Sequence, residues 1–156
     1  MTRRQALLLS LPGWVMAQRN PDAPPFRAKT LGGELVTPET IKNKVALIQF
    51  WTTWCGVCRA DQAAVDEITR KFKDKGLIVL AVSVQEDRET VSRYLQKSPR
   101  EPKIVLTADT NLVSTYRPRA FPSYLIIDRQ GRIAGVQEGG GGEPALLELL
   151  RKAGIG

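Results

Sequence analysis

The chain contains two cysteines, which lie three positions apart in the segment FWTTWCGVCRAD (50–61). Such a pair could be a redox centre, half of a metal site, or two sulfurs buried in a core. The chain has no histidine, and a structural zinc site needs about four ligands, so the composition argues against zinc. The absence of histidine also excludes His-activated nucleophiles, and Arg59 after Cys58 excludes a CxxCH haem attachment. No metal and no cofactor is expected.

The cysteines lie at a junction between a predicted strand and a predicted helix. The run VALIQFW (45–51) is nearly all apolar, which is typical of a strand buried on both faces. Helical spacing of apolar residues then predicts a helix from about Cys55 to Lys75. At its N-terminus, unpaired N–H groups and the helix dipole stabilise an anion such as a thiolate. We therefore expect Cys55 to be the exposed attacking sulfur, and Cys58, one turn inward, to resolve the mixed disulfide.

Two inert arrangements of the cysteines compete with this redox interpretation. Buried free thiols are common in cores, and structural disulfides are common in exported proteins. A structural disulfide usually closes a long loop, because the loop length sets the entropic gain. A two-residue loop gains little in this way, which favours the redox interpretation.

The remaining pattern alternates strand-like and helix-like segments. A hairpin is predicted around Gly32 and Gly33, and a short helical turn in TPETIKN (37–43). Later elements are a strand at 77–84, a helix capped by Asp87 and ending at Lys97, a strand at 103–106, a short helix capped by Asp109 or Thr110, a hairpin joined by DRQG (128–131), a flexible GGGG connector (139–142), and a terminal helix closed by Gly154. This order predicts a mixed sheet with helices on both faces.

The N-terminus carries the features of an export signal. MTRR is followed by an apolar stretch of twelve residues and by Val15-Met16-Ala17. We expect a signal peptide over 1–17, a linker over 18–25 and one domain over 26–154, with either general secretion or the twin-arginine route. Without the signal's two arginines, the formal charge of +7 becomes +5. The basic residues are spread along the chain, so no nucleic-acid partner is expected.

The segment FWTTWCGVCRAD resembles the active-site segment of thioredoxin-fold proteins, especially the TlpA/ResA group of exported bacterial thiol-disulfide oxidoreductases. The strand VALIQFW, the segment YRPRAFPSYLIIDRQGRI (116–133) and an insertion over 87–106 resemble that group's layout. The resemblance covers about residues 26–154. It implies an α/β fold: a thioredoxin-like three-layer α/β/α sandwich with a mixed sheet, an N-terminal β-hairpin and a central α-β insertion.

The resemblance also implies roles for individual residues. Cys55 is the expected nucleophile and Cys58 its partner, with the Trp54 indole beside the reactive sulfur and Trp51 packed beneath the loop. Pro122 matches the family's cis-proline, which exposes the backbone of Phe121 to an extended substrate segment. Asp61 occupies the place of a glutamate thought to relay protons to the buried thiol; an exposed aspartate that only favours the helix dipole is the alternative.

The expected function is reduction of protein disulfides outside the cytoplasm, in the periplasm or an equivalent compartment. The protein is expected to be a monomer, either in solution or anchored at its N-terminus. The resemblance implies a DsbD/CcdA-like membrane thiol carrier as electron donor and the CxxCH cysteines of apocytochrome c as a substrate class. One alternative is a peroxiredoxin-like thiol peroxidase: Thr52 lies three residues before Cys55, although Ile48 replaces the upstream proline. The other is a non-catalytic binding module.

Overall fold

The sheet at the centre of the molecule has seven strands, in a computed structural model that describes residues 19–156. Its strand order is β2-β1-β5-β4-β3-β6-β7. The strands are β1 (Ala28–Thr30), β2 (Leu35–Val36), β3 (Val45–Trp51), β4 (Leu77–Ser83), β5 (Lys103–Thr110), β6 (Ser123–Ile127) and β7 (Ile133–Glu138). The three central strands β3, β4 and β5 run parallel, and β6 and β7 add an antiparallel hairpin.

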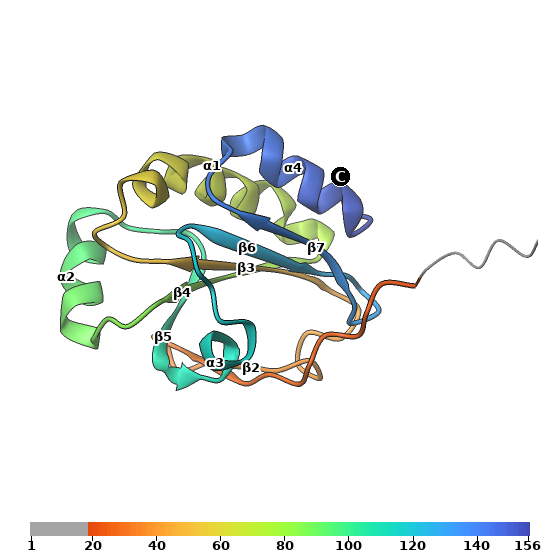
Figure 1. The fold of residues 1–156 in the computed structure, drawn as a ribbon, viewed down its shortest axis with the longest axis horizontal. Helices are drawn as coiled ribbons and strands as arrows, with labels where there is room; N and C mark the ends of the chain where they lie inside the picture. Colours follow the sequence, from red (N-terminus) through yellow and green to blue (C-terminus); the bar gives the residue numbers. More distant parts are fainter. Residues whose placement is uncertain (1–18) are drawn as a thin grey trace, which may run out of the picture.

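Helices and an N-terminal segment cover the two faces of this sheet (Figure 1). Helices α1 (Gly56–Phe72) and α4 (Gly142–Lys152) bury Val65, Ile68 and Leu146 against one face. On the other face, two residues pack against the strands: Phe26 from the N-terminal segment, and Leu112 from helix α3 (Leu112–Tyr116). All seven residues of β3 are buried, because the strand is covered on both sides. The architecture is the three-layer α/β/α sandwich with a mixed sheet that the resemblance implied.

Helix α2 (Arg88–Lys97) closes the end of the sheet at which β3 and β4 finish. Its buried Val91 packs in a small apolar cluster with Trp51 and Ala81, and this cluster also contains both cysteines. Because parallel strands bring their carboxyl ends to the same edge, the loops after β3 and β4 meet there. The inserted α2–β5 unit therefore borders the cysteine pair directly.

Most predicted boundaries are confirmed, and two need correction: the end of the strand predicted over 103–106 and the cap of the short helix after it. The helix from Cys55 is an α-helix to Phe72 followed by a 3₁₀ turn, η1 (Lys73–Lys75), and Gly76 ends it with a φ of 88°. The strand predicted over 103–106 continues to Thr110, because β1 pairs with its second half. Asp109 and Thr110 therefore lie in the strand, and the cap of α3 is Asn111.

The N-terminal part of the described chain is attached to the hairpin β6–β7. The N–H of Ala23 donates to the carbonyl of Gly131 at 2.9 Å, and the N–H of Ile133 donates to the carbonyl of Pro21 at 2.8 Å. Part of the predicted linker therefore adds backbone pairing to the sheet. The signal peptide predicted over 1–17 lies outside the described residues. Within residues 19–156, no helix has the length and apolar character needed to cross a membrane.

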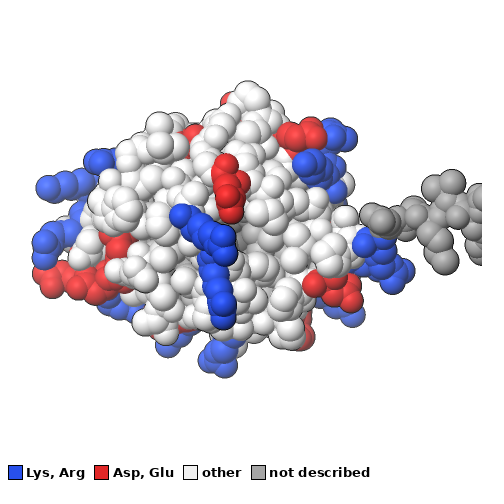
Figure 2. Space-filling view, in the orientation of Figure 1, with Lys and Arg blue, Asp and Glu red and all other residues white. Residues whose placement is uncertain are grey.

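Charged side chains are dispersed on the face of the molecule drawn in Figure 2. Lysines and arginines occur there in separate groups, and several lie beside acidic residues. Three ion pairs link Arg70 to Glu67, Arg93 to Glu89, and Arg151 to Glu148, each between well-exposed side chains within one helix. Exposed pairs contribute little stability. The face drawn in Figure 2 shows no continuous basic surface of the kind a polyanion would need.

Candidate active site

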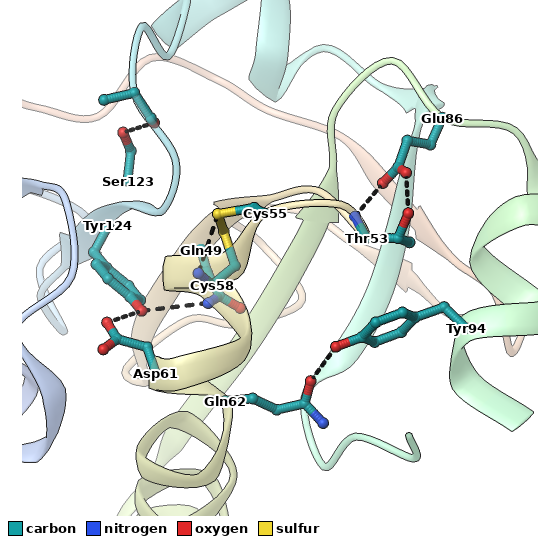
Figure 3. The surroundings of a disulfide bond; sticks show 11 residues. Gln49, Thr53, Cys55, Cys58, Asp61, Gln62, Glu86, Tyr94, Ser123 and Tyr124 are labelled. Carbon is teal, nitrogen blue, oxygen red and sulfur yellow. Dashed lines mark hydrogen bonds between the residues drawn. A yellow bond between two sulfur atoms is a disulfide. The ribbon is translucent and has the colours of Figure 1, made fainter. Parts of the chain in front are cut away.

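A disulfide between Cys55 and Cys58 lies at the start of α1, where the sequence predicts a redox pair (Figure 3). Cys55 is the N-cap residue, with extended backbone angles, and its Sγ accepts a hydrogen bond from the N–H of Cys58 at 3.0 Å. This N–H is one of the unpaired donors of the first helical turn. The structure thus aims a helix N-terminus at the sulfur of Cys55, an arrangement that stabilises a thiolate there.

The burial of the two cysteines corrects one expectation. Cys55 is only 6% exposed and Cys58 3%, so in the disulfide form neither residue is an exposed sulfur. The exposed groups are their neighbours: Trp54 is 68% exposed and Val57 52%. The exposed surface around the disulfide is therefore formed by these apolar side chains rather than by the sulfurs themselves.

Trp54 and Phe121 lie together, Phe121 packs against the cluster that contains both cysteines, and Pro122 follows it in the chain. The rings of Trp54 and Phe121 meet edge to face, with centroids 6.2 Å apart, a favourable arrangement of aromatic rings. The Phe121–Pro122 peptide bond is cis. Phe121 lies before the first residue of β6 and outside its ladder. The Pro122 carbonyl accepts a hydrogen bond from the N–H of Gly139 at 2.8 Å, which joins this loop to the glycine segment.

Asp61 is buried beneath the site, so the alternative of an exposed aspartate is wrong. It is 6% exposed, and its Oδ2 accepts a hydrogen bond from the Tyr124 hydroxyl at 2.9 Å. Its Oδ1 accepts one from the N–H of Gly142 at 3.1 Å. Gly142 is the first residue of α4, whose own N-cap residue provides no side-chain hydrogen bond. The carboxylate of Asp61 on α1 therefore caps α4, which fixes the two helices to each other.

Tyr124 connects Asp61 to Gln49, and sequence analysis did not single it out. Its hydroxyl donates to Asp61 and accepts a hydrogen bond from Nε2 of Gln49 at 3.3 Å. Burial raises the pKa of Tyr124 well above its ordinary value, and the hydrogen bond to Asp61 adds to the effect. The tyrosine thus stays protonated at neutral pH and remains a donor to Asp61. A tyrosine inside an apolar run such as 123–127 could have been noticed, because a buried hydroxyl needs a partner.

The glycine segment 139–142, predicted as a flexible connector, packs tightly over α1. A Cβ added at Gly140 would lie 2.7 Å from Cγ1 of Val57 and 3.2 Å from both carboxylate oxygens of Asp61. Gly139 and Gly142 have φ values of 84° and 64°, which favour glycine. The glycines are therefore required by close approach and by backbone conformation, and the prediction of a flexible connector is corrected.

Replacing Gly140 with alanine is expected to lower the free energy of unfolding by about 1–3 kcal/mol, because the new methyl group overpacks against Val57 and Asp61. Urea denaturation measures the change. Gly32→Ala is the matched control, since a Cβ there has ordinary contact with Oγ1 of Thr30 at 3.7 Å, and it should change stability by less than about 0.5 kcal/mol. Equal effects of the two substitutions would contradict the tight packing of Gly140.

A buried arginine packs beneath the site at the α2 side. The guanidinium carbon of Arg100 lies 4.9 Å from the centroid of the Trp51 ring, and its side chain is 1% exposed. Its Nε lies 3.7 Å from Oδ1 of Asp66 on α1. Burial lowers the pKa of Arg100 and raises that of Asp66. Trp51 is thus the packing residue that was expected, with Arg100 on its ring and Tyr94 beside it. The burial of Arg100 was not predicted, because the segment SPREP (98–102) is typical of an exposed turn.

Glu86 is a further residue that sequence analysis missed. It follows β4, and its carboxylate accepts hydrogen bonds from Thr53, two residues before Cys55. The two loops follow adjacent parallel strands, so the proximity of Glu86 to Thr53 could have been anticipated.

Thr52, the residue that suggested a peroxidase, has a buried hydroxyl without a hydrogen-bond partner among the described residues. It therefore makes no hydrogen bond to the sulfur of Cys55.

The fold and the site together define a class of protein. A disulfide at a helix N-terminus, after a buried parallel strand and beside a cis-proline, is the arrangement of a thioredoxin-fold thiol-disulfide oxidoreductase. Among residues 19–156, no group of three or more cysteine or acidic side chains could hold a metal ion.

Comparison with known proteins places the chain in a family. A family model described as Redoxin matches residues 18–150. "Thiol-disulfide oxidoreductase ResA" of Bacillus cereus is 25% identical over 112 residues, which are 72% of this chain and 65% of that protein. "Thioredoxin-like protein YneN" of Bacillus subtilis is 30% identical over 124 residues, 78% of this chain and 72% of that protein. The chain thus spans just under two thirds of the length of this ResA protein.

A solved structure of a thiol:disulfide interchange protein of the thioredoxin family from Chlorobium tepidum superposes with a TM-score of 0.77. It is 20% identical, and the match covers 87% of this chain and 97% of that one, which supports the fold. The chain belongs to the Redoxin family. Within it, the ResA relatives confirm the resemblance to thioredoxin-fold proteins of the TlpA/ResA type.

Proposed function

We propose that the protein reduces disulfides of other proteins outside the cytoplasm. The observation that carries the proposal is the Cys55–Cys58 disulfide, with the N–H of Cys58 directed at the sulfur of Cys55. In the reduced form, the Cys55 thiolate attacks one sulfur of a substrate disulfide, and the other substrate sulfur leaves as a thiolate. Cys58 then loses its proton, attacks Cys55 and releases the second substrate thiolate. Two electrons pass to the substrate, and the Cys55–Cys58 disulfide remains.

The substrate is expected to bind over the apolar groups around the disulfide. Exposed Trp54 and Val57 lie on either side of Cys55 in the sequence. Phe121, whose backbone lies outside the β6 ladder, offers hydrogen-bonding groups to an extended segment, as an added strand would use them. The CxxCH segment of apocytochrome c, with its two cysteines joined in a disulfide, would be such an extended substrate. We propose it as the substrate class on the resemblance to the TlpA/ResA group.

A reductant in an oxidising compartment needs an electron supply, for which we propose a DsbD/CcdA-like membrane thiol carrier. Such a carrier would attack the Cys55–Cys58 disulfide through its own thiolate and leave the pair reduced. The export pattern over 1–17 supports the location outside the cytoplasm. The same disulfide and the same exposed surface then serve both partners in turn, with the protein acting as a monomer.

The direction of electron flow is tested by the reduction potential of the pair. After equilibration of the purified protein with glutathione buffers, we expect a potential of about −270 mV or below, where reductants lie. A potential near about −120 mV, the range of strong oxidants, would contradict the proposal. Reduction of insulin with dithiothreitol as donor tests turnover, and its absence would favour a non-catalytic binding module. A rapid burst of peroxide consumption would instead favour the peroxidase.

A further inference from the structure

The carboxylate of Glu86 accepts three hydrogen bonds, two from Thr53 in the loop that leads into the active site and one from Ser83 at the end of β4. Its Oε1 accepts from the backbone N–H of Thr53 at 2.8 Å and from the hydroxyl of Ser83 at 2.8 Å. Its Oε2 accepts from the hydroxyl of Thr53. Figure 3 shows this group on the side of the disulfide opposite Asp61 and Tyr124.

Cys55 is attached to α1 by the disulfide, by its carbonyl, which accepts a hydrogen bond from the N–H of Arg59 at 3.1 Å, and by its Sγ. Residues 52–54, which precede it, have fewer attachments. The N–H of Cys55 donates to the carbonyl of Thr52 at 3.4 Å, which is long for a hydrogen bond between backbone groups. Trp54 is mostly exposed, and its aromatic contact is with the edge-on ring of Phe121. The hydrogen bonds from Thr53 to Glu86 are therefore the polar attachment of this segment to the β4–α2 side of the site.

We infer that Glu86 is a positioning residue for the Cys55–Cys58 pair: by holding Thr53, it holds Trp54 and Cys55 at the N-terminus of α1. The inference rests on the proposed function, which supplies the reaction to be measured. The carboxylate of Glu86 accepts hydrogen bonds from Thr53 and Ser83 rather than contacting the two sulfurs through a hydrogen bond. Its effect on catalysis passes through the position of the loop. A misplacement of reacting groups by about 1 Å can cost about 100-fold in rate.

Two substitutions at Glu86 separate position from charge. Glu86→Gln keeps the shape: its carbonyl oxygen accepts from Thr53 N–H and Ser83, and its NH₂ group donates to the hydroxyl of Thr53. Glu86→Ala removes the same charge and also removes every hydrogen bond. The two variants have equal net charge, so a difference between them reports the attachment of the loop.

The test measures kcat/KM for insulin reduction in the two variants and in Glu89→Ala, which removes an exposed glutamate of α2 paired with Arg93. We expect Glu86→Ala to lose about tenfold or more, and Glu86→Gln to stay within about threefold of the unsubstituted protein. Glu89→Ala should be unchanged. Equal kcat/KM in the Ala and Gln variants, whether both are high or both are low, would overturn the positioning role.

A second readout keeps this inference separate from the proposed function. The alkylation rate of Cys55 by iodoacetamide in the reduced protein should fall in Glu86→Ala and hold in Glu86→Gln, even if insulin is not a substrate. Equal alkylation rates would count against Glu86. If Glu86→Ala fails to fold in circular dichroism, Thr53→Val removes the hydroxyl bond alone and should lose about threefold. A Thr53→Val variant with full kcat/KM and full alkylation rate would then overturn the inference.

Discussion

Cys55→Ser is expected to remove all disulfide turnover, whereas Cys58→Ser should retain the first half of the reaction. Both residues are nearly buried, with exposed fractions of 6% and 3%, so exposure alone does not assign their roles. The hydrogen bond from Cys58 N–H to Cys55 Sγ assigns the roles. It stabilises negative charge on Cys55 and makes this sulfur the attacking thiolate. Serine at position 55 cannot form the mixed disulfide.

The measurement combines insulin turnover with trapping of the intermediate. Cys58→Ser should accumulate a mixed disulfide through Cys55, visible by mass spectrometry as one substrate chain per molecule. Cys55→Ser should accumulate none. In the native host, the Cys58→Ser variant would also identify the physiological partners. A mixed disulfide trapped through Cys58 in the Cys55→Ser variant would show that the two roles are reversed.

Asp61→Ala is expected to lower the free energy of unfolding by about 3 kcal/mol, the second large effect. The carboxylate accepts hydrogen bonds from Tyr124 and Gly142, and hydrogen bonds to charged groups contribute about 1.5–3 kcal/mol each. Alanine leaves the proton of the buried Tyr124 hydroxyl and the N–H of Gly142 without an acceptor. Asp61→Asn should lose about half as much, because its amide oxygen still accepts from one donor while its NH₂ group faces the other.

Urea denaturation measures both variants, with Asp74→Ala in the exposed 3₁₀ turn η1 as the control. Asp74 should change stability by less than about 0.5 kcal/mol. A loss in Asp61→Ala no larger than this control would contradict the capping of α4 by Asp61. Activity of the stable Asp61→Asn variant tests the proton relay that the resemblance implies: a loss of turnover well beyond its loss of stability would support the relay, and full turnover would exclude it.

The parts of this fold that depend on local pattern were predictable. The strand at 45–51 is a nearly continuous apolar run, and Asp87 caps α2 at the N–H of Thr90, at 2.8 Å. Gly76 ends its helix because the left-handed conformation favours glycine. In each case, the residues that decide the structure are close in sequence, so spacing and residue type suffice.

The parts of the fold and of the site that depend on contacts between distant segments could not be predicted from the sequence. Asp61 and Gly142 are 81 positions apart, and no spacing rule relates a helical aspartate to the start of the last helix. Arg100 lies within the turn-like sequence SPREP (98–102), yet it packs on Trp51, because the α2–β5 unit folds back over the end of β3. The continuation of β5 to Thr110 likewise depends on its antiparallel partner β1.

The cap that α1 provides for α4 has a consequence for the order in which the molecule is made. The cysteines are synthesised in the first half of the chain, but the environment of Asp61 is complete only when the final helix has docked. A nascent chain therefore carries the two cysteines before the polar surroundings of Asp61 are complete. The hydrogen bond between Asp61 and α4 forms only after that helix has been synthesised and packed.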